Sequence, residues 1–241
     1  MSAINEKIEN MINQYKQICS IEKDNYKARV DFGIFYTQIG QHKEAIEIFK
    51  EALLLNDKDF SLFRLIGISY NKIKDYDNAI EYLNKAYSLE SNDYISLNYL
   101  GKSLIETKRY EEAIAILNKS FMISSKDYTN WRMFGIALYN IKNIEEAIEA
   151  FERALELNKY DYESLYYLAL SKKENKEYEK AIELLNKILL VEENHYEAHF
   201  NIAYCYYRLE NKSKAIEILN KCIKIDSSRT EAHNLLKEIT T

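Results

Sequence analysis

A repeat of 34 residues constrains this chain more than any other feature. An alanine recurs at that interval six times, each time within a phrase of the type EAIEIFKEAL: Ala45, Ala79, Ala113, Ala147, Ala181 and Ala215. An aromatic residue stands nineteen residues before each of these alanines: Tyr26, Phe60, Tyr94, Tyr128, Tyr162 and Tyr196. A fixed period of this length is typical of solenoids, in which each repeat packs on its neighbours. We therefore expect an array of similar units and not a single globular core.

Small residues hold a third fixed place between these two series: Gly33, Gly67, Gly101, Gly135, Ala169 and Ala203. Four of the five glycines stand in it, and the chain has no proline. Glycines in fixed register indicate a close approach between backbones rather than irregular turns.

Each repeat carries two helical patterns. With the aromatic residue as position 1, the repeats run over 26–59, 60–93, 94–127, 128–161, 162–195 and 196–229. Both patterns place apolar residues with a period of 3.6, which predicts helices and not strands. The residue before five of the first helices is a favoured N-cap: Asn25, Asp59, Asp93, Asp127 and Asp161. The sequence thus predicts two helices per repeat, joined by a short polar turn.

The two ends of the chain follow the same period. Met11, Tyr15 and Ile18 lie 34 residues before Ala45, Phe49 and Ala52, so residues 4–22 are expected to form an unpaired second helix. Residues 230–241 continue as an unpaired first helix, with His233 and Leu236 at packing positions. The predicted organisation is therefore an N-terminal helix in 1–25, six repeats in 26–229 and a capping helix in 230–241, about fourteen helices in all.

These repeats resemble the tetratricopeptide repeat (TPR), whose pattern is W-x2-L-G-x2-Y…A-x3-F…P. The fourth repeat matches it best, through Trp131, Phe134, Gly135, Leu138, Ala147, Phe151 and Ala154. The sequence departs from the family at the proline, which is replaced by Asp57, Ser91, Ser125, Lys159, Glu193 and Ser227. The resemblance implies an all-α, right-handed α–α superhelix.

Composition excludes several classes of function. A net charge of −5 argues against a nucleic-acid partner, although a local basic patch remains open. Cys19, Cys205 and Cys222 show no CxxC spacing, which favours a reducing compartment over a disulfide framework. Because no segment is apolar enough for a standard signal peptide or a membrane span, we expect a cytoplasmic protein without membrane attachment.

One cluster invites a metal site. His195 and His199 stand one helical turn apart, a spacing that zinc sites use. The segment is not HExxH, however, and the repeat assigns His195 to an N-cap and His199 to a packing position. Cys205 and Cys222 are likewise interpreted as buried thiols. We therefore expect no metal, no cofactor and no catalytic activity.

The family resemblance implies that the first helices line a concave groove that holds an extended peptide or a helix. Nine residues are candidate contacts in this groove: Arg64, Asn98, Lys102, Arg132, Tyr166, Phe200, Tyr204, Tyr207 and Arg208. Its middle is predicted to be basic and its C-terminal part aromatic, a combination suited to acidic and apolar partner residues. The alternative is that the tyrosines only bridge adjacent repeats and that the charges are solvated.

A carboxylate clamp for chaperone tails is not expected. The family motif requires lysine, asparagine and arginine at positions that are here Val30, Ile34, Leu65, Ile95 and Tyr99.

The main hypothesis is a non-enzymatic scaffold that binds a peptide or helical segment. One alternative is a self-assembling structural module, a homo-oligomer whose C-terminal helix would stack end to end with another copy. Another is a docking or regulatory domain of a larger enzyme, with this chain as a fragment of a longer protein.

Overall fold

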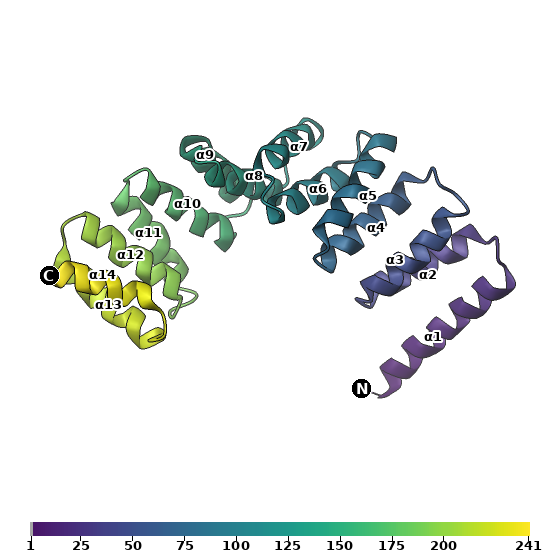
Figure 1. Ribbon diagram of the computed structural model, residues 1–241, viewed down its shortest axis with the longest axis horizontal. Helices are drawn as coiled ribbons and strands as arrows, with labels where there is room; N and C mark the ends of the chain where they lie inside the picture. The colour runs from purple at the N-terminus through teal and green to yellow at the C-terminus, as the bar shows by residue number, and fades with distance from the viewer. Residues whose placement is uncertain (1) are drawn as a thin grey trace. The chain divides into compact units, whose positions relative to one another are not determined.

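The computed structural model describes residues 2–241, and this part consists of fourteen helices and no strand (Figure 1). The predicted all-α repeat fold is therefore confirmed. The first helices of the repeats are α2 (Tyr26–Gln38), α4 (Phe60–Lys72), α6 (Tyr94–Glu106), α8 (Tyr128–Asn140), α10 (Tyr162–Glu174) and α12 (Tyr196–Arg208). The second helices are α3 (His42–Leu53), α5 (Tyr76–Leu89), α7 (Tyr110–Ile123), α9 (Ile144–Leu157), α11 (Tyr178–Leu189) and α13 (Lys212–Ile225). The terminal helices are α1 (Ser2–Ile21) and α14 (Thr230–Thr240).

The chain divides into two compact units, Met1–Ser124 and Ser125–Thr241. The first unit contains α1 to α7 and the second contains α8 to α14. Within each unit, a first helix packs against the second helix of its own repeat, and α2, α4, α6, α10 and α12 also pack against the second helix that precedes them.

The first helices begin at N-caps that satisfy otherwise unpaired backbone N–H groups. Asn25, Asp59, Asp127 and Asp161 accept hydrogen bonds from the backbone as predicted. Asp93 stands at the same position, but its carboxylate makes no such bond to the backbone. The Asp93 carboxylate instead binds the side chains of Arg64 and Ser96.

A residue in the left-handed conformation follows each first helix, two positions after the last helical residue. Gly40 has a φ of 78°, and the residues at the same place in the other five repeats have φ between 60° and 67°: Lys74, Lys108, Lys142, Lys176 and Glu210. In each repeat the next N–H donates to a carbonyl five residues back, as Asp75 does to Tyr70 at 3.0 Å. This is the Schellman arrangement, which reverses the chain within a short polar turn.

The small residue at position 8 allows the two helices of a repeat to touch. A Cβ placed on Gly67 would lie 2.6 Å from Cγ of Leu83 and 3.2 Å from its backbone nitrogen. A Cβ on Gly135 would lie 2.6 Å from the ring of Phe151. Leu83 and Phe151 are completely buried. The glycines therefore set the distance between the paired helices.

Buried aspartates join successive repeats. Arg64 Nη1 contacts Asp93 Oδ1 at 3.0 Å, and Ser96 Oγ donates to Asp93 Oδ2 at 2.6 Å. Two repeats later the same three residue types recur: Arg132 contacts Asp161 at 2.5 Å, and Ser164 donates to the same carboxylate at 2.5 Å. Because a buried carboxylate needs charged and polar partners, each trio fixes one repeat on the next.

Replacing Gly67 by alanine should destabilise the fold by about 1–3 kcal/mol, because the new methyl group overlaps buried Leu83 in a packed core. Urea unfolding of the full chain measures the change as a lower midpoint. Asn84→Ala, an exposed change on α5, is the matched control and should leave the midpoint unaltered. An equal midpoint for Gly67→Ala and the wild type would show that the helices can move apart freely.

Replacing Arg64 by methionine should cost about 3 kcal/mol, because Asp93 would be left buried without its cation. The double variant Arg64→Met/Asp93→Asn should recover most of this loss in the same unfolding assay. Arg153→Met is the control, since its partner Glu156 is exposed and such surface pairs contribute about 0–1 kcal/mol. A double variant no more stable than Arg64→Met would contradict the pairing.

Candidate functional site

Successive first helices lie against one another in the second unit. Contacts join α8 to α10, α10 to α12 and α12 to α14, whereas no comparable series joins α9, α11 and α13 within residues 125–241. Because the first helices are closer together than the second helices, this unit curves toward them. We call the surface formed by α8, α10 and α12 the first-helix surface.

Tyrosines form a continuous aromatic strip across the first-helix surface. The ring of Tyr139 lies 5.9 Å from that of Tyr167, which lies 5.9 Å from Tyr166, and Tyr166 lies 5.7 Å from the imidazole of His195. Burial raises the pKa of Tyr139 to about 12 and also raises the pKa of Tyr166. The strip thus packs between neighbouring repeats.

Tyr204 lies between two cations. Arg208 Nη1 donates to the Tyr204 hydroxyl at 2.9 Å, and its guanidinium also lies 5.5 Å from the ring of Tyr178. Lys173 Nζ lies 5.5 Å from the Tyr204 ring and donates to Asn201 Oδ1 at 2.8 Å. A half-buried aromatic ring is thus held next to the exposed guanidinium of Arg208.

Two other aromatic candidates are fixed by contacts near the C-terminus. The Tyr207 hydroxyl donates to Glu238 of α14 at 2.8 Å, and this bond raises the pKa of Tyr207. The ring of Phe200 stacks on Tyr196 at 6.4 Å, and Arg229 lies 3.9 Å from the centre of the Tyr196 ring. Tyr207 and Tyr196 of α12 therefore help to hold the capping helix α14 in place.

The basic and amide candidates differ in what they contact. Arg64 and Arg132 pair with the buried aspartates described above, and Arg132 Nε also lies 3.2 Å from Glu163. The amide oxygen of Asn98 accepts a hydrogen bond from Ser120 at 2.6 Å. Among the nine candidates, Lys102 and Arg208 are the exposed cations without an ion pair in residues 2–241. The sequence did not predict that Arg64 and Arg132 would form ion pairs within the chain. In both cases the partner is the aspartate 29 residues further on, at the N-cap of the next first helix.

The histidines and cysteines take the structural positions that the repeat predicted for them. His195 Nδ1 accepts a hydrogen bond from the N–H of Ala198 at 3.2 Å, and His199 Nε2 lies 2.8 Å from the carbonyl oxygen of Glu193. Cys205 and Cys222 are completely buried, and burial raises their pKa to about 12 and about 11. Over residues 2–241, no group of three or more His, Cys, Asp or Glu side chains is arranged to hold a metal ion.

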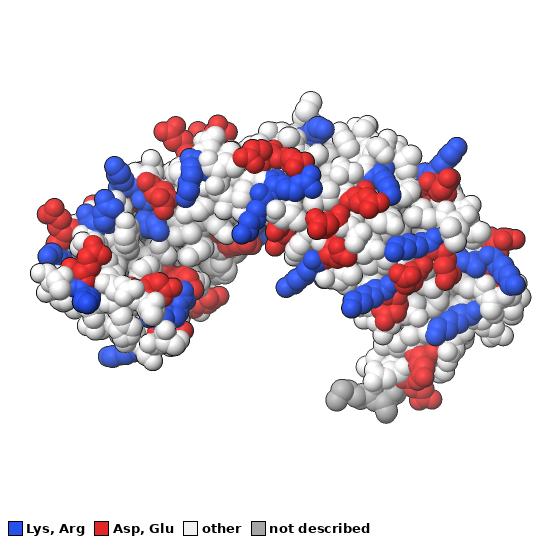
Figure 2. All heavy atoms as spheres, in the orientation of Figure 1, with Lys and Arg blue, Asp and Glu red and all other residues white. Residues whose placement is uncertain are grey.

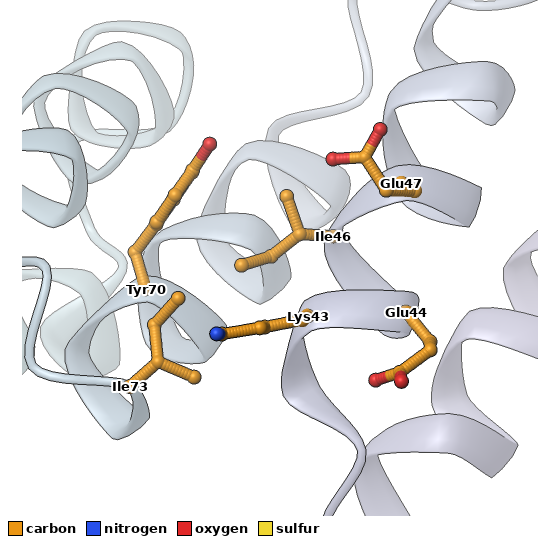
Figure 3. Close-up of a pocket in the computed structure, with 6 residues that line it drawn as sticks. All are labelled: Lys43, Glu44, Ile46, Glu47, Tyr70 and Ile73. Carbon is orange, nitrogen blue, oxygen red and sulfur yellow. The ribbon is translucent and has the colours of Figure 1, made fainter.

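A shallow depression of about 350 Å³ lies between α3 and the end of α4. Figure 3 shows Lys43 and Ile46 extending from α3 toward Tyr70 and Ile73. None of the nine candidates lines it, and the sequence did not single it out.

Charges of both signs are interspersed on the visible face of the protein (Figure 2). Within residues 2–241, no helix is both long and apolar enough to cross a membrane.

Comparison with protein families finds matches over most of the repeats. The model for "Anaphase-promoting complex, cyclosome, subunit 3" matches residues 72–154 and again 142–222, and a tetratricopeptide repeat model matches residues 26–59. No curated protein matches the chain.

Solved structures share the fold at low sequence identity. The structure of YrrB, described as a TPR protein with an unusual peptide-binding site, is 22% identical with a TM-score of 0.70, and the match covers 78% of this chain and 97% of YrrB. PilF of Pseudomonas aeruginosa is 20% identical with a TM-score of 0.72, and the match covers 88% of this chain and 97% of PilF.

A chain of the Cut9–Hcn1 hetero-tetramer of the APC/C is 21% identical with a TM-score of 0.70, and the match covers 98% of this chain and 46% of that one. With the repeat period, the paired helices and the family matches in agreement, this chain belongs to the tetratricopeptide repeat family.

Proposed function

We propose that this chain is a non-catalytic scaffold whose first-helix surface binds an extended or helical segment of another protein. Tetratricopeptide repeat proteins are in general protein-interaction scaffolds. A peptide-binding site is described for YrrB, which supports a peptide as the class of ligand. As part of the same proposal we place the protein in the cytoplasm, where its three free thiols would stay reduced.

The arrangement around Tyr204 is the observation that carries the proposal. Tyrosine and arginine are enriched among the residues that dominate binding energies, because they combine a large contact area with polar groups. Tyr204 is held in place by Lys173 and Arg208, so little conformational entropy is lost when a ligand covers it. Arg208 can then form a bidentate hydrogen bond with a carboxylate of the ligand.

The internal ion pairs indicate which cations are available to a ligand. The guanidinium groups of Arg64 and Arg132 already bind buried carboxylates, so a ligand would have to compete with an internal partner. Lys102 in the first unit and Arg208 in the second have no carboxylate to displace in the part of the chain described. On the first-helix surface we therefore assign recognition of acidic ligand residues to Arg208, and of apolar residues to Tyr166 and Tyr204.

Arg208→Glu should weaken peptide binding about tenfold, because it removes the cation next to Tyr204 and places a carboxylate there. A random peptide library is selected against the full chain, and the strongest peptide is titrated by fluorescence anisotropy. Arg208 is exposed, so the change should leave the unfolding midpoint close to that of the wild type.

Arg153→Glu is the matched control, since it makes the same charge change on α9, away from the first-helix surface. Equal affinities for Arg208→Glu and Arg153→Glu would place the peptide elsewhere and refute the assignment. A library that yields no binding peptide would refute the proposed peptide-binding function.

A further inference from the structure

The junction between the fifth and sixth repeats differs from those that an arginine and an aspartate hold together. In the second and fourth repeats, position 5 is an arginine and position 34 is the aspartate that it binds. In the fifth repeat these two positions hold Tyr166 and His195, and the ring of Tyr166 lies 5.7 Å from the imidazole. A contact between two rings therefore replaces the ion pair, and it involves a tyrosine assigned above to the ligand.

His195 caps α12 through a nitrogen that a proton would block. Its Nδ1 accepts a hydrogen bond from the backbone N–H of Ala198 at 3.2 Å, so the capping ring carries no proton on Nδ1. Asn25 accepts the equivalent bond from Ala28 at 2.8 Å. Asparagine has no group that titrates near neutral pH, whereas histidine ordinarily changes charge between pH 5 and 8. Protonation of Nδ1 in that range would therefore remove the side-chain cap of α12.

A carboxylate stands next to the same nitrogen. Glu197 Oε2 lies 3.5 Å from His195 Nδ1, while Glu197 Oε1 accepts a hydrogen bond from Arg229 Nη1 at 2.5 Å. The bond from Arg229 lowers the pKa of Glu197, so the carboxylate stays ionised throughout the range in which histidine titrates. A protonated Nδ1 can thus donate to Glu197 in place of accepting from Ala198, which requires the ring to turn toward the carboxylate.

The other groups around this ring keep one charge state between pH 6 and 8 or make contacts that do not depend on it. Tyrosine titrates near pH 10, and burial raises the pKa of Tyr166 further. His199 Nε2 lies 2.8 Å from the carbonyl oxygen of Glu193, a contact in which both the neutral and the protonated ring can donate. The elements around the ring carry these charged or titratable groups: Glu163 and Tyr166 of α10, Glu192 and Glu193 before α12, Glu197 and His199 of α12, and Arg229 and Glu231 at the start of α14.

We propose that His195 is a positioning residue for Tyr166 and makes binding at the first-helix surface depend on pH. This inference rests on the function proposed above. At pH 8 the neutral ring caps α12 and packs on Tyr166. At pH 6 the protonated ring turns toward Glu197, changes its contact with Tyr166 and adds one positive charge beside it. A ligand segment with acidic residues is therefore bound more tightly at the lower pH.

An NMR titration of the full chain from pH 8 to pH 6 measures this change without a ligand. The amide resonance of Ala198 and the ring resonances of Tyr166 should shift with the same midpoint as the His195 ring. Both should stay nearly constant in His195→Asn, which keeps a favoured N-cap but cannot take up the proton. Resonances of Ala198 and Tyr166 that do not follow the His195 titration would overturn the proposal.

Binding is measured by fluorescence anisotropy with the strongest library peptide that contains acidic residues and no histidine. The wild type should bind it about threefold more tightly at pH 6 than at pH 8, as expected for one added charge near the protein surface. His195→Asn should bind equally at both pH values. His199→Gln is the matched control, because it removes the neighbouring histidine and keeps a donor, and it should retain the wild-type difference.

Equal affinity of the wild type at both pH values would refute this inference and leave the proposed function intact. A pH dependence that persists in His195→Asn, or one lost in His199→Gln, would also refute it. Absence of any binding peptide at both pH values would refute the proposed function, and the pH dependence of binding with it.

Discussion

The contact between a small residue on each first helix and a bulky residue on its partner determines the geometry of the repeats. Gly67 against Leu83 and Gly135 against Phe151 leave no room for a methyl group, so the two helix axes are held close together. Ala169 and Ala203 occupy the same place in the last two repeats, where Leu185 and Leu219 are also fully buried. Since this distance recurs with each period, successive pairs present the same faces, and within the units α4 meets α6, α8 meets α10 and α10 meets α12.

Two arginines form ion pairs inside the array. Arg64 and Arg132 each bind an aspartate that is nearly inaccessible to water. In each case a serine three residues after the aspartate donates a hydrogen bond to the same carboxylate. A buried carboxylate without partners would be strongly destabilising, so these arginines contribute to cohesion between repeats. The cations left for a ligand are fewer than the sequence suggested, and one of them, Arg208, stands beside an aromatic ring. In the function proposed above, binding and cohesion depend on different basic residues, Arg208 for binding and Arg64 and Arg132 for cohesion.

The two ends of the array differ for a simple steric reason. At α14 a lysine stands where the repeats need glycine or alanine, and its exposed neighbours His233 and Thr240 are polar. At α1 the corresponding face remains apolar, with Tyr15 and Met11 half-buried and Ile18 exposed.

The sequence by itself determined the helices, their order and the residues that pack within each pair. The period places Gly67 opposite Leu83, assigns His195 to an N-cap and buries Cys222, because all of these depend on the position of a residue along its own helix. The tertiary structure decided which polar side chains meet. Arg64 and Lys102 carry the same charge and were both predicted to face the groove, yet Arg64 pairs with Asp93 and Lys102 stays exposed. The period fixes the direction in which a side chain leaves its helix, whereas its partner depends on how closely the next repeat packs against that helix.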